Sequence, residues 1–200
     1  MEKNSIYKVS KKIIIYLNET RENPSTKAIL ANLRNSSNRP IGENIESLAF
    51  IFSMVPEEEL GVSHKLNSFE DTLLTVLQLY ALYQQGKDDQ VIFIEEGKSK
   101  SFGMSLKSIK TSEKDESNST DLRFNALINA SDFNELKQHL RQLIKILRSK
   151  TDDKVDFPTL AKDLYEYNKY NSKDSIRIKW ARDYYRSSKN ENNKGEYDEK

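Results

Sequence analysis

The 200-residue chain has no cysteine, two histidines and only six glycines, and each scarcity excludes a class of site. Without cysteine there is no disulfide and no thiolate ligand or nucleophile, and His64 and His139 alone do not complete a zinc site. The sequence also lacks the G-x-x-x-x-G-K-[ST] loop that cradles nucleotide phosphates. No residues are spaced as a nucleophile and its base. We therefore expect no catalytic centre, no metal and no cofactor.

Long apolar runs are absent as well. The longest clean run, Ile13–Leu17, falls far short of the roughly 20 residues that span a bilayer. We expect no transmembrane helix, and the lack of cysteine fits the reducing environment of the cytoplasm. The sequence therefore favours a cytoplasmic protein.

The net charge of only +1 hides a segregation of charge along the chain. Residues 1–42 hold eight Lys/Arg against three Asp/Glu, residues 43–97 hold two against eleven, and residues 98–186 hold nineteen against thirteen. Two basic segments thus flank an acidic one. If the basic segments share one face of the fold, that face suits a polyanion, because neutralisation of phosphates by Lys and Arg drives nucleic-acid binding.

Apolar residues recur at helical spacing through nearly all of the sequence. We predict helices over residues 6–19, 23–35, 44–55, 68–85, 101–112, 122–130, 132–148, 158–168 and 174–186. Ser68 and Asp71 approximate a capping box, and residues 87–98 carry the one strand-like pattern, which we expect to form a loop or small ribbon. The expected fold is a single all-α bundle of about eight to nine helices over residues 1–186. A flexible linker is expected near 113–120 and a disordered tail at 187–200.

The helix expected at 132–148 carries two stripes. Leu136, Leu140, Leu143 and Leu147 fall within an arc of about 60° around its axis, and four cations fall within a neighbouring arc of about 80°. These cations are Lys137, Arg141, Lys145 and Arg148. Because they border the apolar stripe, they favour a track for an anionic partner. The alternative is a solvated surface that happens to be basic.

Three further clusters of cations lie on other predicted helices, and the cluster in the second helix is the weaker instance. They are Lys179, Arg182 and Arg186 in the last helix, Lys27 and Arg34 in the second, and Lys107 and Lys110 in the fifth. In the last helix Ile178, Ala181, Tyr184 and Tyr185 are expected to form the apolar side, with Trp180 at its edge. Arg177, near that side, is expected to pair with a carboxylate at the buried edge. Each cluster alone is most often a solvated face, but four clusters outside the acidic segment favour phosphate binding.

The aromatic residues at core spacing are expected to bury their rings and satisfy their hydroxyls. Tyr167 and Tyr170 are the best candidates for stacking on nucleic-acid bases. No predicted helix begins with the Asn/Gln/Arg cluster that reads base edges, so phosphate contact without base readout is favoured.

Five segments occur in an order that resembles a known family. They are AILANLRN, LLTVLQLYALYQ, SFGMSLKSI, LRFNALINASDFNELKQHLRQLIKILR and DFPTLAKDLYEYN followed by DSIRIKWARDYYR. The last two are the most specific. Over about residues 6–186 the chain resembles the CasB family, the small subunit of the type I-E CRISPR surveillance complex Cascade.

The resemblance implies an all-α, non-catalytic protein. Two copies would lie head to tail beside the guide RNA and target DNA and would help to hold the opened target, including its displaced strand. The other implied partners are the backbone subunits and the large subunit of Cascade. The chain departs from the family at Asn35 and Ser36, where an arginine and a glycine often follow, and at Tyr167, where tryptophan is common. Residues 87–98 have no clear counterpart.

The predicted function is therefore that of a non-catalytic Cascade small subunit that binds nucleic-acid backbone. The candidate binding residues are Lys27, Arg34, Lys107, Lys110, Arg123, Lys137, Arg141, Lys145, Arg148, Lys179, Arg182 and Arg186. Two alternatives stay open. One is a helical protein–protein adaptor whose basic stripes meet acidic partners, and the other is an enzyme that uses His64 or His139.

Overall fold

A computed structural model describes residues 5–36, 45–87, 91–95, 97–112, 117–169 and 172–186. These residues form nine α-helices, one short 3-10 helix and no strand, which confirms the all-α prediction. The elements are α1 (Ser5–Glu19), α2 (Pro24–Ser36), α3 (Ile45–Met54), η2 (Glu57–Glu59), α4 (Ser68–Gln84), α5 (Phe102–Ser112), α6 (Ser117–Ile128), α7 (Phe133–Lys150), α8 (Phe157–Lys169) and α9 (Lys173–Tyr185). Residues 113–116 of the expected linker and the tail 187–200 lie outside the described residues, and α6 begins at Ser117.

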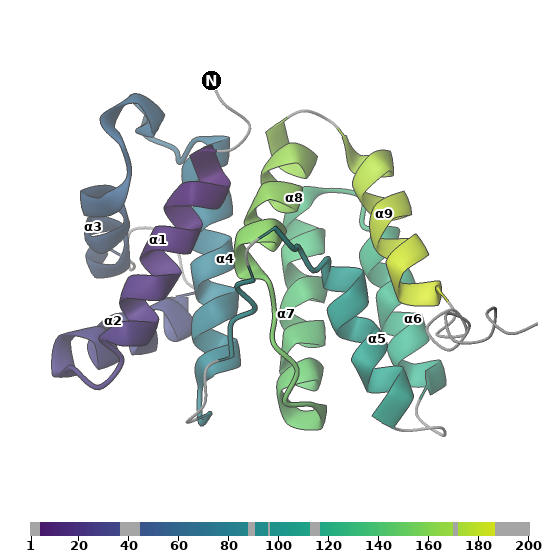
Figure 1. Ribbon diagram of the computed structural model, residues 1–200. Helices are drawn as coiled ribbons and strands as arrows, with labels where there is room; N and C mark the ends of the chain where they lie inside the picture. Colours follow the sequence, from purple (N-terminus) through teal and green to yellow (C-terminus); the bar gives the residue numbers. More distant parts are fainter. Residues whose placement is uncertain are drawn as a thin grey trace, which may run out of the picture.

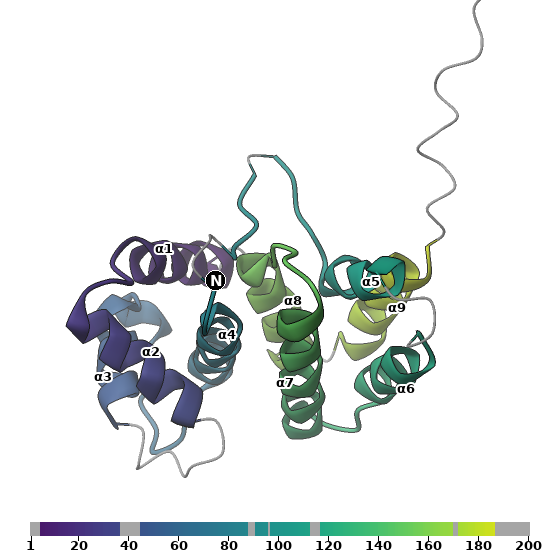
Figure 2. The same cartoon turned by 90° about the horizontal axis from the view of Figure 1, so that it is seen from below.

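The helices gather around a central pair, α4 and α8, which pack against each other (Figure 1). On one side α2 packs on α4 and α3 packs on α2, while on the other α5 and α8 contact α9, and α6 contacts α7. Helix α1 touches both α4 and α8 and so joins the two sides. Figure 2 shows α1 and α5 toward one face of the molecule, with α2, α6 and α7 toward the opposite face.

The core is built from the stripes that the sequence displays. The four leucines of α7 are each at most 1% exposed, and nearly every side chain of α4 is buried. Helix α4 begins one residue earlier than the predicted capping box, because Asn67 is the N-cap and Glu70 completes the box. The Asp71 side chain is therefore free of the capping role that the sequence suggested. Gly86, just beyond the helix, has φ +74°, a left-handed conformation that glycine adopts without strain.

Residues 91–95 and 97–100 form a loop with one β-bridge, within the loop or small ribbon that was predicted. An isolated parallel bridge joins Ile92 to Val155. The Phe93 N–H donates to the Val155 carbonyl and the Val155 N–H donates to the Val91 carbonyl, both at 3.0 Å. Lys100 forms an ion pair with Asp153 beside the bridge. The strand-like sequence pattern thus corresponds to a single β-bridge in the structure.

The orientation of α9 differs from the prediction. Ile176, Trp180 and Tyr184 are buried, whereas Ile178 and Tyr185 are about half exposed, at 48% and 50%. One close contact and the burial of one large ring explain this rotation. A Cβ on Gly103 of α5 would lie 2.2 Å from the Trp180 carbonyl oxygen, so the two helices approach more closely than any other residue there would allow. Burial of the large Trp180 ring outweighs that of Ile178.

Candidate nucleic-acid interface

The cationic stripe of α7 lies against α4 and the end of α2. Lys137 forms an ion pair with Asp71 of α4, with an Nζ–Oδ1 distance of 3.2 Å. Arg141 donates from Nη2 to the Arg34 carbonyl at 3.2 Å, and Arg148 donates to the Leu82 carbonyl and to Gln85 Oε1. Lys145 is exposed and has no partner in the described part of the chain. The stripe therefore borders the core, as predicted.

Arg34, Arg141 and Arg148 lie close together, and we refer to them as the arginine cluster. Burial lowers the pKa of the Arg34 guanidinium, and the positive charge of Arg148 lowers it further. Burial likewise lowers the pKa of Arg141. Within residues 5–36, 45–87 and the other described segments, Arg141 and Arg148 donate only to carbonyl and amide oxygens, never to a carboxylate. The cluster is thus a half-buried concentration of positive charge.

Two donors of this cluster lack an acceptor. The Nε and Nη1 atoms of Arg141 are buried, and neither has a hydrogen-bond partner among the described residues. A buried donor without an acceptor raises the free energy of the folded state by about 1–3 kcal/mol. For a charged group the increase is larger. An anion that drew the guanidinium outward would remove this cost.

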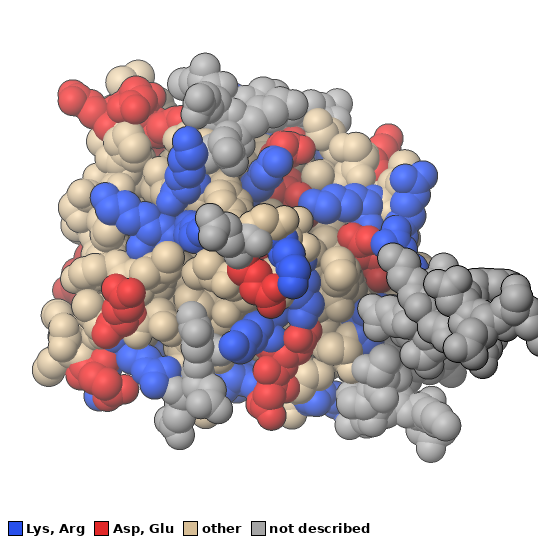
Figure 3. All heavy atoms as spheres, viewed as in Figure 1, with Lys and Arg blue, Asp and Glu red and all other residues tan. Residues whose placement is uncertain are grey.

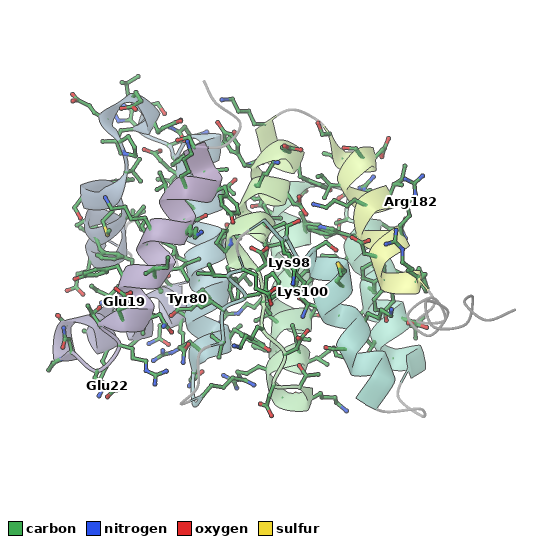
Figure 4. The ribbon with its side chains drawn as sticks, in the orientation of Figure 1. Glu19, Glu22, Tyr80, Lys98, Lys100 and Arg182 are labelled. Atoms are coloured by element: carbon green, nitrogen blue, oxygen red, sulfur yellow. The ribbon has the colours of Figure 1, made fainter. Side chains whose placement is uncertain are left out.

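The cations of α9 have different surroundings. Lys179 forms an ion pair with Asp163 at 2.7 Å, and the Trp180 Nε1–H donates to the same carboxylate at 2.7 Å. Burial raises the pKa of the Asp163 carboxyl, while Lys179 and Trp180 act in the opposite direction. Lys179 therefore serves the packing of α8 against α9. Arg182, labelled in Figure 4, and Arg186 are exposed and have no side-chain partner in the described part.

The other candidates are dispersed. Lys27 is exposed and pairs with Glu22 at 2.9 Å, Lys107 is half-buried, and Arg123 donates to Ser119 within α6. The side chain of Lys110 lies outside the described residues.

Two predictions about residues near the apolar edges were wrong. Tyr167 is 1% exposed and donates its hydroxyl to the Ala130 carbonyl at 3.1 Å, so its ring is not open to stacking. Arg177 donates to the same carbonyl, and the carboxylate it reaches, Asp174 at 3.4 Å, is exposed instead of buried. Tyr170 lies outside the described residues.

The cation clusters do not converge on one face. The arginine cluster lies between α2, α4 and α7, whereas Arg182 lies at the far edge of the molecule on α9 (Figures 2 and 4). On the face drawn in Figure 3, Lys and Arg side chains alternate with Asp and Glu. The sequence interpretation also passed over α1. Its Lys11 and Lys12 have no partner among the described residues, and the +5 charge of residues 1–42 was the available signal.

The same residues offer little for other chemistries. The described part of the chain has no group of three or more His, Cys, Asp or Glu that could hold a metal ion. His139 is half-buried, with Nε2 3.5 Å from Glu135 Oε1 on the next turn of α7. None of the described helices combines the length and apolar character of a membrane-spanning segment.

Three solved structures share this fold. CasB from Thermobifida fusca has a TM-score of 0.67 and 22% identity, covering 90% of this chain and 97% of its own. CasB from M. ruber has a TM-score of 0.66 and 22% identity, with coverages of 88% and 93%. A Cse2-family CRISPR-associated protein from Thermus thermophilus has a TM-score of 0.62 and 20% identity, with coverages of 89% and 98%. No curated protein matches the chain.

The fold, with its cation-bordered helices, is therefore that of the CasB class of helical proteins. The model of the family described as CRISPR-associated protein Cse2 matches residues 29–185, and the chain belongs to this family. Cse2 and CasB are two names for the small-subunit family of type I-E Cascade, which confirms the resemblance found in the sequence.

Proposed function

We propose that this Cse2-family protein acts in the cytoplasm as the non-catalytic small subunit of type I-E Cascade. In this role it binds the backbones of guide RNA and target DNA, including the displaced strand, and thereby holds the target open. The observation that carries the proposal is the arginine cluster, because it concentrates cations from α2 and α7 with no carboxylate on Arg141 or Arg148 in the described residues.

The electrostatics of the cluster favour a polyanion. Arg34 and Arg148 repel each other, and both Arg34 and Arg141 have lost part of their hydration. A phosphate between them would replace repulsion by attraction and offer acceptors in the geometry that a guanidinium matches with two hydrogen bonds. Exposed Lys145, one turn from Arg141 on α7, would extend the contact along the backbone.

Contacts of this kind do not read sequence. Phosphate contacts position a protein on nucleic acid, and in RNA-guided complexes base pairing with the guide supplies the specificity. The partners proposed with this role are the Cascade backbone and large subunits and a second copy of the chain.

The test measures binding to unrelated single-stranded DNAs of equal length across a salt series. We expect similar affinities for all sequences and a steep loss of binding with salt, with a slope of about 0.7 per phosphate contact on single strands. A strong preference for one sequence, or a salt-independent affinity, would contradict the proposal. No nucleic-acid binding by the chain or by the assembled complex would favour the protein–protein adaptor instead.

The enzyme alternative is tested separately. His64 is exposed, and in the described residues His139 pairs with Glu135 of its own helix. A complex carrying His64→Ala and His139→Ala is therefore expected to retain full target binding and interference. Loss of a chemical step in this folded double variant would contradict the non-catalytic role.

A further inference from the structure

A pocket of about 260 Å³ lies where η2, the start of α4 and the end of α8 meet. Its lining includes Glu58, Glu59, Leu60, Phe69, Tyr165 and Lys169. We refer to it as the acidic pocket. Its glutamates come from the acidic segment of the sequence. Figure 3 shows acidic side chains gathered at the upper left, over the stretch that follows α3.

One acid in this pocket has no partner. Glu59 is 7% exposed, and its carboxylate makes no hydrogen bond or ion pair with any part of the described chain, although its carbonyl accepts from Asn67 Nδ2 at 2.9 Å. The neighbouring Glu70 offers the contrast, because its carboxylate accepts from the backbone N–H groups of Gly61 and Asn67, both at 2.8 Å. Burying a carboxylate without a partner is unfavourable. The Glu59 carboxylate oxygens are not fully enclosed, because they are not among the buried side-chain atoms without a partner, and a cation that enters the pocket would meet this need for a partner.

Lys169 does not fill this need, although it lines the pocket. Its Nζ donates to the Tyr165 hydroxyl at 2.6 Å and lies 5.0 Å from the centroid of the same ring. No ion pair joins it to Glu58 or Glu59 in the described structure. The acids line the pocket together with Phe69 and Tyr165, whose rings pack edge to face with their centroids 5.7 Å apart.

We propose that the acidic pocket receives an arginine side chain from a partner protein. The guanidinium would bind the Glu59 carboxylate, with Glu58 beside it, and the aliphatic stem would lie along Phe69 and Tyr165. The volume is below the roughly 300–1,000 Å³ of small-molecule sites and suits one long side chain. Arginine fits better than lysine because it binds a carboxylate through two parallel hydrogen bonds and stacks on aromatic faces.

The partner at this end is a protein and not a nucleic acid. Glu57, Glu58 and Glu59 follow one another in η2, and their charges repel phosphate. The inference goes beyond the proposed nucleic-acid role and does not depend on it, because no residue of the arginine cluster contributes to the pocket.

The probe is a capped Gly-Arg-Gly peptide added to the full-length ¹⁵N-labelled chain, up to tens of millimolar, since a single side chain binds in the weak range. Capped Gly-Lys-Gly and the neutral isostere Gly-citrulline-Gly are the comparison peptides. We expect shifts of the Phe69, Tyr165 and Lys169 amide resonances in the order arginine, lysine, citrulline. The absence of shifts, or equal shifts with citrulline, would overturn the proposal.

Matched variants assign the effect to the pocket. Glu59→Gln should weaken arginine-peptide binding at least about tenfold, the loss of one charge-assisted pair, whereas Glu19→Gln, which removes an exposed acid of α1, should leave it unchanged. Glu58→Gln supplies a second variant if Glu59→Gln does not fold, and it should weaken binding to a lesser degree. Single-stranded DNA binding should be the same in all variants. Unchanged peptide binding in a folded Glu59→Gln chain, or shifts of the pocket resonances with an oligonucleotide, would overturn the proposal and leave the nucleic-acid role untouched.

Discussion

Helices α7 and α9 look alike in sequence and differ in what their cations meet. Each pairs an apolar side with cations at helical spacing. In the structure, Lys179 of α9 reaches the buried carboxylate of Asp163, while Arg141 and Arg148 of α7 reach only carbonyl and amide oxygens in the described residues. The same pattern thus gives Lys179 a buried carboxylate in α9, while two half-buried arginines of α7 meet no carboxylate in the described residues. The contrast concerns these side chains and not the whole helices, because Lys137 of α7 also pairs with Asp71.

The difference comes from the helix that lies opposite. Asp163 projects from α8 and is 3% exposed on its side chain, so Lys179 compensates a buried charge. The α4 residues facing Arg148 are near the C-terminal end of that helix, where free carbonyls attract a cation without neutralising it. A cation opposite a carboxylate is neutralised within the fold, whereas a cation opposite a helix end keeps its charge.

The largest effect is expected from the buried stripe of α7. Leu140 is 0% exposed, and Leu140→Ala should lower the free energy of unfolding by about 2–5 kcal/mol, through lost burial and a cavity. Urea denaturation measures it, with exposed Gln142→Ala on the same helix as the control. A cost equal to that of Gln142→Ala would mean that α7 is not docked by its leucines.

The second largest effect on stability is expected from the ion pair between Lys179 of α9 and Asp163. Asp163→Asn should cost about 1–3 kcal/mol, because it removes the charge opposite Lys179 and weakens the acceptor of the buried Trp180 N–H. Asp174→Asn is the control, since Asp174 is exposed and 3.4 Å from Arg177. Thermal melts should separate the two variants. Equal melting temperatures would remove the contrast between α9 and α7.

The third prediction compares the two helices in binding. Arg141→Gln with Arg148→Gln should reduce the salt slope of single-stranded DNA binding by about 1.4, two contacts at about 0.7 each, and should weaken retention of target DNA by the assembled complex. Lys179→Gln should leave the slope near wild type, because its charge is already engaged by Asp163. Gel shifts on folded variants measure both effects. The opposite ranking would place the nucleic acid on α9.

The smallest expected effect is the change in the free energy of unfolding when Arg34 is replaced. Its positive charge lies near that of Arg148 and is partly desolvated, so Arg34→Gln should change the free energy of unfolding by no more than about 0.5 kcal/mol, while nucleic-acid binding falls. Lys65→Gln, which removes an exposed lysine that is not a candidate binding residue, is the control for loss of one charge. A clear destabilisation by Arg34→Gln would show that its charge supports the fold.

The sequence by itself determined the helices and much of the core. The 3.6-residue period located all nine helices of the described residues, and the leucines of α7 are buried as their spacing predicts, because burial of an apolar stripe is decided locally by the helix geometry. The sequence also determined the family, because five segments in order resemble it and the family model matches residues 29–185.

Only the tertiary structure decided which charges are neutralised within the fold. The sequence ranked Lys179 with Arg141, and it placed Ile178 and Tyr185 of α9 on the buried side. The charge of Lys179 is neutralised by Asp163, sixteen residues away on another helix. The rotation of α9 depends on the close approach that Gly103 permits. Likewise, nothing in the order of residues marks Glu59 as the acid without a partner and Glu70 as the one with two. Periodicity fixes which side of a helix is apolar, but the partner of a charge is set by long-range packing, which a local pattern does not contain.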